Sequence, residues 1–516
     1  MFCPSYSPLP PKIKRPKASP RRGPTSLLPR PYVDEASVFR YSTGNILARG
    51  PALACPIDGN EPSMNDKVSS CLPEGAPFHS YEDVMAHLNG LGVFHMDMGL
   101  GRMERALAAL GLDKLRIPTV QVVGTNGKGS TSSFLQSLAM AHGLSAGLYT
   151  SPHFIVPEER IRVGHTMLPP KRWAPLASQA VMAEAGLTYF ELITVMAAEA
   201  FALSSCDLII YEAGLGGRYD ATSALPAHMT CFVPIDLDHV EVLGRTIAAI
   251  AEDKADAMQN GRLLAVSAPQ PEDARRALEA RADELGLPLC SQPTEHDCKG
   301  TESGQALWTS LPQELRELAL LPADAKLGLH GPHQRMNAQT ALLAWILLCH
   351  RFGWKTDREA IERGLAEAFI PGRLQYAPAA EARPALWLDG AHNEHGMTAL
   401  VTALKDGNAV PSSLRPGAVV FSCLRDKGPE KLTSMLRETV GDTPVFVPEI
   451  KDNPRAATRE ELCALFGPQA QPAASLDEAI SNAAKAAGDT PVLICGSLYL
   501  LGDVFARFTE LLEGGN

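Results

Sequence analysis

The sequence lacks the cysteine spacings that hold metals or form redox pairs. Its eleven cysteines are scattered over 516 residues, and no C-x-x-C pair occurs. This excludes zinc-ribbon and thioredoxin-like sites. Cysteines such as Cys206 and Cys495 stand in apolar runs and are predicted to be small buried hydrophobic residues. The odd count and the lack of a recognisable signal peptide favour a reducing, cytoplasmic location.

Long apolar runs and a positive net charge are also missing. The longest uncharged apolar run, Ala341–Cys349, is far shorter than the ~20 residues that a membrane helix needs. With 47 Lys and Arg against 58 Asp and Glu, the net charge is −11. No overall positive field therefore recruits nucleic acid or a membrane surface. We expect a monomer with small-molecule partners, whose positive charge is concentrated at particular Lys and Arg residues.

The N-terminal segment has little that could form a core. The first 62 residues hold 12 of the 41 prolines, and the first 50 carry nine Lys and Arg against two acids. No apolar periodicity is visible, so we predict that residues 1–76 are disordered. The dense prolines oppose the amphipathic helix of an organelle transit peptide. Met64 is an alternative start of the protein.

From residue 77 on, short apolar strands alternate with helical stretches, which predicts a mostly parallel α/β sheet. A second alternation begins near Gly331, after the weakly patterned stretch 292–304. We therefore predict two α/β domains, over residues 77–328 and 329–516, the second smaller and Rossmann-like. The expected strands are Thr119–Val123, Ala146–Thr150, Asp207–Glu212, Cys231–Pro234, Leu386–Leu388, Val419–Ser422, Pro444–Val447 and Val492–Cys495, with helices from Ser130 and over Asn337–Cys349.

A glycine-rich loop between the first strand and its helix predicts a phosphate site. Its residues are Gly124, Thr125, Asn126, Gly127, Lys128, Gly129, Ser130 and Thr131. Glycines let backbone N–H groups point inward, and the helix N-terminus favours phosphate oxygens. Lys128 is placed to reach the β and γ phosphates of ATP, and Ser130 or Thr131 to meet Mg²⁺. The loop departs from the usual pattern, because Gly129 separates Lys128 from Ser130.

Ordered motifs over about residues 80 to 505 resemble one family. Gly124–Ser130 is followed by Gly147–Phe154, and the later matches are Leu187–Glu191, Glu212–Arg218, Asp220–Thr222, Asp238 with His239, Leu243 with Gly244, Lys254 with Ala255, Pro371–Arg373, Leu388–Asn393, Arg425–Lys427 and Cys495–Tyr499. In this the chain resembles the folylpolyglutamate synthase/dihydrofolate synthase family of the Mur ligase superfamily. The resemblance implies a P-loop ATPase domain followed by a second α/β domain.

The resemblance implies Mg²⁺ ligands at Ser151, Glu212 and His239. It implies two ions, since ATP and an acyl phosphate gather much negative charge. From the residues alone, a strand-end acid is often a helix cap and a single histidine is more often structural. The residues around Lys254 alone predict a surface helix with a salt-bridging lysine. The family's matching lysine is carbamylated, which implies that Lys254 becomes an anion and holds the second metal.

The second domain is expected to complete the ATP site with Asn337, Arg373, Asp389 and His392. Taken singly, Asn337, Arg373 and Asp389 are more typical of a helix cap, a surface arginine and a turn. For the pterin substrate the resemblance implies two contact strips, one of Tyr189, Phe190 and Glu191 and one of Tyr219, Asp220 and Ala221. Ser223 stands where the family usually has Asn, which puts one loop contact in doubt.

The implied activity is an ATP-dependent ligation of L-glutamate to a folate-type carboxylate through an acyl phosphate. Lys128, Lys254, Arg373 and His392 are the predicted catalytic residues, acting by positioning and charge neutralisation. The acceptor is dihydropteroate, a reduced folate, or both, and the sequence leaves this open. Two alternatives are a Mur-type cell-wall ligase and a non-catalytic nucleotide-binding protein on the same fold. No residue identifies itself as the base for the glutamate amine.

Overall fold

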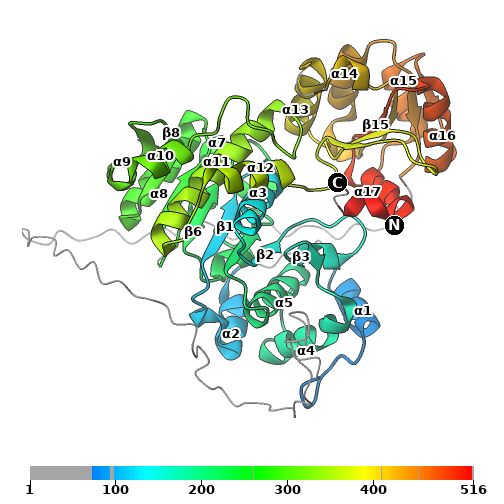
Figure 1. The fold of residues 1–516 in the computed structure, drawn as a ribbon. Coiled ribbons are helices and arrows are strands. Elements are labelled where there is room, and N and C mark those ends of the chain that lie inside the picture. The colour runs from blue at the N-terminus through cyan, green and yellow to red at the C-terminus, as the bar shows by residue number, and fades with distance from the viewer. Residues whose placement is uncertain (1–71, 93–97, 260, 408–409, 451–452, 514–516) are drawn as a thin grey trace, which may run out of the picture. The chain divides into compact units, whose positions relative to one another are not determined.

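A nine-stranded sheet organises the first half of the described chain (Figure 1). The computed structural model describes residues 72–92, 98–259, 261–407, 410–450 and 453–513, which lie in one compact unit. Residues 1–71 of the predicted disordered extension, with the alternative start Met64, lie outside the described residues.

The strand order of this sheet is β4-β3-β2-β5-β1-β6-β7-β8-β9. The six strands from β2 to β8 in this order are parallel, and β3, β4 and β9 are antiparallel edge strands. The strands are β1 (Thr119–Val123), β2 (Ala146–Tyr149), β3 (Ile161–Val163), β4 (Thr166–Met167), β5 (Leu208–Glu212), β6 (Met229–Phe232), β7 (Leu264–Ser267), β8 (Leu289–Pro293) and β9 (Cys298–Gly300).

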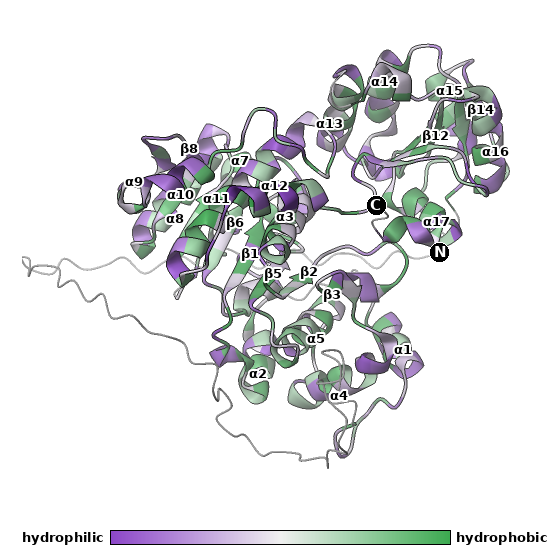
Figure 2. Ribbon diagram, viewed as in Figure 1, coloured by the Kyte–Doolittle hydropathy of each residue, from purple (hydrophilic) through white to green (hydrophobic). Residues whose placement is uncertain are grey.

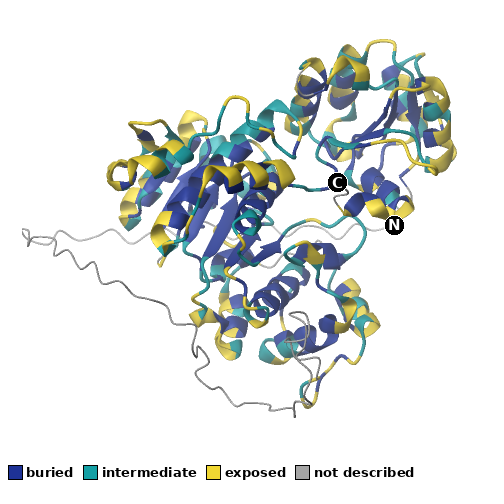
Figure 3. Cartoon of the chain, viewed as in Figure 1, coloured by how far each residue is buried: buried dark blue, intermediate teal, exposed yellow. Residues whose placement is uncertain are grey.

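Helices cover both faces of this sheet, because the central strands are apolar on both sides. Val120 and Val122 face a core shared with α3 (Lys128–Ala141). The other face is covered in two parts. One holds α1 (Tyr81–Leu91), α2 (Gly101–Leu110), α4 (Trp173–Ala183) and α5 (Tyr189–Leu203), and the other holds α7 (Ile247–Ala255) and α8 (Glu272–Leu285). The remaining helices of this half are α6 (Val240–Leu243), α9 (Glu302–Ser310) and α10 (Gln313–Leu318). Figure 3 shows the central strands buried and the outer helices, such as α9, lined with exposed residues.

A second sheet of six strands, in the order β10-β11-β15-β12-β13-β14, follows in the chain. All its pairings are parallel except that of β10 with β11. The strands are β10 (Gln375–Ala377), β11 (Leu386–Asp389), β12 (Ala418–Phe421), β13 (Val445–Val447), β14 (Ala470–Pro472) and β15 (Val492–Cys495). One face packs on α13 (Glu394–Lys405), α14 (Pro429–Val440) and α15 (Arg459–Phe466), and the other on α16 (Leu476–Ala487) and α17 (Leu498–Arg507). Figure 2 shows hydrophobic residues along α17.

The helices α11 (Pro332–Phe352) and α12 (Arg358–Glu367) belong to the first sheet, although the sequence placed them at the start of the second domain. Both pack on α3, and their buried residues share its core (Figure 1). The run Ala341–Cys349 lies inside α11 and is buried throughout. The structural division therefore falls near β10, about 45 residues after the predicted boundary at 328, because these apolar helices need the sheet for cover.

The predicted α/β class and the positions of the main strands are confirmed. All eight predicted strands are present within two residues of their expected bounds, and the helices predicted from Ser130 and over Asn337–Cys349 are present as α3 and α11. Cys206 and Cys495 are buried, as expected. No helix among the described residues is long and apolar enough to cross a membrane.

Candidate active site

Four neighbouring parallel strands, β2, β5, β1 and β6, carry site residues at their carboxyl ends, where parallel sheets bind ligands. The glycine-rich loop follows β1. Its Thr125 N–H donates to the carbonyl of Pro234 over 2.9 Å, which holds the loop to the chain after β6. Gly124 has φ +154, and a Cβ there would lie 2.3 Å from Val233 Cγ2. Only glycine fits this position, so the close approach is built into the loop.

Two lysines converge on this loop. Lys128 Nζ donates to the carbonyl of Gly124 over 3.2 Å and to that of Thr125 over 3.1 Å. Lys254 Nζ donates to the same Gly124 carbonyl over 2.9 Å. Among the described residues, neither lysine lies within ion-pair distance of a carboxylate. Two ammonium groups on one oxygen repel each other, so the site favours a bound anion.

Lys254 is buried, with 4% of its surface exposed. The prediction from the local sequence, that Lys254 is a surface lysine in a salt bridge, is therefore wrong. Helix α7 carries Lys254 to the glycine-rich loop. The backbone of Lys254 also packs closely against Gly217, since a Cβ on Gly217 would lie 2.6 Å from the Lys254 carbonyl oxygen. Burial and the neighbouring Lys128 lower the pKa of Lys254 to about 7, because both disfavour the charged amine.

Glu212 places a carboxylate at the start of α3. A Cβ on Gly129 would lie 3.6 Å from each of its oxygens. The Ser151 N–H donates to Glu212 Oε2 over 3.1 Å, so the chain just after β2 is joined to the last residue of β5. Burial raises the pKa of Glu212, while Lys128, the Ser151 N–H and Arg373 oppose the shift. Ser151 and Glu212, two of the predicted metal ligands, are thus brought together.

His239 lies at the start of the short helix α6 with φ 48, a left-handed conformation. Its imidazole is half-exposed, and Nε2 lies 3.7 Å from Asp238 Oδ2. Burial lowers the pKa of His239; Asp238 opposes the shift, and Lys427, Lys128 and Lys254 add to it. Among the described residues, no three His, Cys, Asp or Glu side chains converge as a metal site.

The loop has polar groups that suit a phosphate ligand. Asn126 Nδ2 is buried without a hydrogen-bond partner in the described chain. Buried donors of this kind are rare unless a ligand or water completes them. Together with Lys128 and the start of α3, this unmatched donor fits a nucleotide phosphate.

Residues from the second sheet and from α11 border the same loop. Arg373, in the linker before β10, acts on the pKa of Glu212. Asn337 of α11 lies against the loop, since a Cβ on Gly127 would be 2.5 Å from its Oδ1. Its Nδ2 donates to Gln334 Oε1 over 2.9 Å. The predicted ATP residues Asn337 and Arg373 are thus close to the loop.

Asp389, predicted to contact ATP, accepts two backbone N–H groups in this structure. It is buried at the end of β11, and its two oxygens accept the N–H groups of Leu374, over 2.7 Å, and Ala391, over 2.8 Å. Burial raises its pKa, while Arg373 and these N–H groups oppose the shift. With both oxygens engaged, Asp389 holds the backbone beside Arg373 and His392 in place.

His392 is set up as a neutral ring. Its Nδ1 lies 2.8 Å from the carbonyl of Gly390, so Nδ1 carries the proton and Nε2 keeps a lone pair. Burial lowers the pKa of His392, and Arg373 and Lys427 contribute in the same direction. In the neutral ring this hydrogen bond leaves Nε2 as an acceptor.

A cleft of about 1450 Å³ opens beside this cluster. Gly129, Ser151 and Glu212 line it from the first sheet, and Arg373 and Leu498 line it from the second. It is large enough for a substrate far bigger than glutamate, and it runs along the linker between the two sheets.

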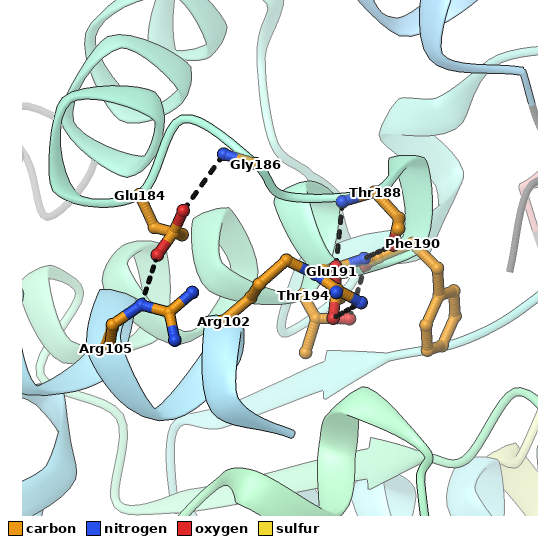
Figure 4. A network of polar contacts seen from close by, with 8 residues as sticks. All are labelled: Arg102, Arg105, Glu184, Gly186, Thr188, Phe190, Glu191 and Thr194. Atoms are coloured by element: carbon orange, nitrogen blue, oxygen red, sulfur yellow. Dashed lines mark hydrogen bonds and ion pairs between the residues drawn. The ribbon is translucent and has the colours of Figure 1, made fainter. Parts of the chain in front are cut away.

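In the strip Tyr189–Glu191, the Glu191 carboxylate is engaged by other residues of the chain (Figure 4). Glu191 Oε2 accepts the Thr188 N–H over 2.8 Å at the start of α5, and both its oxygens pair with Arg102 over 3.0 Å. Tyr189 is 4% exposed, under the guanidinium of Arg160. Only Phe190 keeps a partly exposed ring that could stack on a heterocycle; it supports Gly214, where a Cβ would lie 2.7 Å from its Cζ.

The strip Tyr219–Ala221 divides in the same way. Tyr219 is 51% exposed, whereas Ala221 is buried. Asp220 is buried, and its oxygens accept the N–H groups of Gly214, Leu215 and Thr222. Asp220 therefore shapes the loop after Glu212 rather than pointing to a ligand.

Sequence reasoning missed the residues that support this loop. Gln121 of β1 donates from Nε2 to Thr222 and Ser223 over 2.9 and 2.8 Å, and Arg262 donates to Gln121 Oε1 over 3.0 Å. Ser223 Oγ in turn donates to the Gly217 carbonyl over 2.5 Å. Ser223 thus makes two contacts of its own within this loop region. In the sequence, only Gln121, a polar residue inside an apolar strand, could have indicated this supporting network.

Comparison with known proteins agrees with this geometry. Residues 372–498 match the Mur ligase, glutamate ligase domain. The chain is 32% identical over 441 residues to the dihydrofolate synthase/folylpolyglutamate synthase of Bacillus subtilis, covering 83% of this chain and 99% of the relative. Two solved structures have TM-scores of 0.67 and cover 84% of this chain and 98% of theirs: the Escherichia coli FolC protein in complex with DHPP and ADP, 29% identical, and the Yersinia pestis bifunctional folylpolyglutamate synthase/dihydrofolate synthase with AMPPNP and a Mn ion, 26% identical. With a relative this similar matched over almost its whole length, the chain belongs to the folylpolyglutamate synthase/dihydrofolate synthase family.

Proposed function

We propose that this protein joins the amine of L-glutamate to a carboxylate of a folate-type substrate and uses ATP to do so. The observation that carries the proposal is the pair Lys128 and Lys254 on one Gly124 carbonyl, beside the buried Glu212. This cluster needs an anion, and a phosphate donor fits it. The matched glutamate ligase domain and the family's names supply the amine and the acceptor.

The reaction has two steps. The acceptor carboxylate attacks the γ-phosphorus of ATP, the bond to the β-phosphate oxygen breaks, and ADP leaves behind an acyl phosphate. The amine of glutamate then attacks the acyl carbon, the bond to the phosphate oxygen breaks, and inorganic phosphate leaves as the amine loses a proton. The sum is ATP, acid and amine giving ADP, phosphate and amide.

The side chains act mainly by position and charge. Lys128 and Arg373 compensate the negative charge that moves from the γ-phosphate to ADP. Asp389 fixes the backbone at Leu374, next to Arg373, and at Ala391, next to His392, which helps to position both side chains. Bound Mg²⁺ would add charge neutralisation at the phosphate oxygens, with Ser151, Glu212 and His239 as the residues that would hold it.

We further propose that Lys254 carries a carbamate. Its amine is buried, has no carboxylate partner among the described residues, and has a pKa near 7, so a neutral, nucleophilic amine is available to CO₂. Carbamylation forms an N–C bond, releases one proton and replaces a cation with an anion. That change removes the repulsion with Lys128 and adds the oxygen ligands that two metal ions need.

The test of the carbamate uses Lys254→Gln, which cannot react with CO₂, and Lys254→Glu, which restores an anion. Activity should fall at least 100-fold in the first and recover partly in the second. Labelled bicarbonate should mark Lys254 in the wild-type protein on chemical trapping. An active Lys254→Gln variant would exclude the carbamate.

For the acceptor we propose that one site takes both dihydropteroate and reduced folates. The decisive assay supplies ATP, Mg²⁺ and glutamate with either acceptor and reads the product by mass spectrometry. We expect one added glutamate on dihydropteroate and a ladder on tetrahydrofolate. Lys128→Ala should abolish ADP release with either acceptor; normal turnover in this variant would refute the assigned site.

We also propose that the protein acts as a monomer in the cytoplasm. Light scattering of the active protein should give the mass of a single chain.

A further inference from the structure

The loop after β2, residues 151–156, touches both sides of the site. At its first residue, the Ser151 N–H donates to Glu212 Oε2 over 3.1 Å. Three residues later, Phe154 reaches the second sheet's helix α17, where its ring meets that of Phe505 edge-on at 4.7 Å between centroids. Phe505 is completely buried. The loop therefore runs from the proposed metal carboxylate into the other core.

The same phenylalanine contacts the residue before Arg373. A Cβ on Gly372 would lie 3.2 Å from Phe154 Cζ, and Gly372 has φ +67, a left-handed conformation. A Cβ on Gly502 of α17 would lie 2.9 Å from the Phe154 carbonyl oxygen. Glycine at both positions lets the loop approach closely. The ring of Phe154 thus limits where the linker, and with it Arg373, can lie.

Glu159 makes the loop rigid. Its carboxylate is 5% exposed and accepts three consecutive N–H groups, those of Phe154 over 2.8 Å, Ile155 over 2.7 Å and Val156 over 2.9 Å. A charged acceptor that satisfies three backbone donors holds them more strongly than neutral bonds do. The tip of the loop is therefore fixed relative to β3, which begins two residues after Glu159.

We propose that Phe154, held by Glu159, is a positioning residue that sets Arg373 relative to Glu212 for phosphoryl transfer. Phe154 lines the cleft beside the linker, and it acts on Arg373 through Gly372. Misplacing a catalytic group by about 1 Å can cost roughly 100-fold in rate, so a loose contact here should be visible in kcat. The inference rests on the proposed ligase activity.

The experiment compares Phe154→Ala with the wild-type protein in the full chain. We expect kcat for ADP release to fall roughly 10- to 100-fold while KM for ATP and the Kd of ADP change less than about twofold, since the P-loop is untouched. Phe154→Leu, which keeps an apolar side chain, should recover most of kcat. Glu159→Gln should show a smaller loss of the same kind, because its amide nitrogen cannot accept an N–H.

A double-mutant cycle with Arg373→Lys separates positioning from general damage. If Phe154 acts through Arg373, the two losses should be clearly less than multiplicative. Phe508→Leu, at a buried aromatic residue of the same core, is the control: it should lower stability and leave kcat unchanged.

Three results would overturn the proposal: multiplicative losses, equal losses in kcat and ADP affinity, or an unchanged kcat in Phe154→Ala. If Phe154→Ala fails to fold, the same criteria apply to Phe154→Leu and Glu159→Gln. An inactive wild-type protein would instead refute the proposed ligase function, so the two failures are distinguishable.

Discussion

Lys254 and Lys128 donate to the same carbonyl oxygen, that of Gly124, from helices whose sequences are more than a hundred residues apart. Without an anion, this pairing is unfavourable, because each ammonium loses solvent and meets another cation. The resulting low pKa of Lys254 makes the stability of the protein depend on pH.

The Lys254 pKa predicts how stability changes between pH 7 and 10.5. The folded pKa is about 7 against an ordinary value of 10.5. Between these values the unfolded chain binds the extra proton, so the free energy of unfolding rises with pH, by up to about 1.4 kcal/mol per pH unit. Lys254→Met should remove this slope. Urea denaturation in CO₂-free buffer at several pH values measures it, and parallel curves for both proteins would contradict the assignment.

Glu191 should prove structural rather than substrate-binding. Its carboxylate is engaged by Arg102 and Thr188 (Figure 4), so Glu191→Gln breaks a buried pair and should cost roughly 2–4 kcal/mol of stability. Arg102→Leu should cost a similar amount, and neither variant should change KM for the acceptor more than about threefold.

The neighbouring pair Arg105 and Glu184 is the matched control, because its arginine is 63% exposed. Glu184→Gln should affect the melting temperature far less than Glu191→Gln. A large rise in KM in Glu191→Gln with normal KM in Arg102→Leu would instead restore a direct contact with substrate.

Asp389→Asn should lower both stability and kcat. The single amide oxygen of Asn cannot accept both the Leu374 and the Ala391 N–H groups, so one buried donor loses its partner. This loss should lower the free energy of unfolding by about 1–3 kcal/mol. Because these bonds flank Arg373 and His392, kcat should fall more than KM for ATP. Steady-state kinetics with denaturation curves test this, and the exposed Asp442→Asn is a control. A change in KM alone would favour a direct contact with ATP.

Ser223→Ala should loosen the loop after Glu212. The substitution removes the hydrogen bond to the Gly217 carbonyl and one hydrogen-bond partner of Gln121. It should lower the free energy of unfolding by about 1–2 kcal/mol. Ser223→Asn, the residue more usual in the family, should keep activity, since its amide both donates and accepts. Equal activity in all three proteins would show that the contact does not matter for the reaction.

Local patterns explain why much of the fold was predictable. The strands Thr119–Val123 and Val492–Cys495 were placed correctly because their apolar runs end at glycine-rich turns. The phosphate loop was found for the same reason, since glycine spacing and one lysine lie within eight residues. Strand ends then located Ser151 and Glu212, because adjacent parallel strands present their carboxyl ends at one edge.

Long-range partners explain what was missed. The local sequence predicts Lys254 at the surface, because its partner Gly124 lies 130 positions earlier in the chain. Glu191 and Arg102 are 89 positions apart, so nothing near Glu191 shows that its carboxylate is already paired. The domain boundary was misplaced because α11 is apolar on nearly all sides, and such a helix fits the core of either sheet.

Dividing the chain to produce its two sheets separately would have to follow Pro371, not residue 328. A cut at 328 strips α11 and α12 from α3, baring Phe134, Leu135 and Leu138 on one fragment and the apolar core of α11 on the other. Exposed surfaces of this size promote aggregation. A cut after Pro371 leaves Ser133 bonded to the Phe369 carbonyl and Ile370 against Gly129, so the nucleotide loop would stay with the helices that cover it.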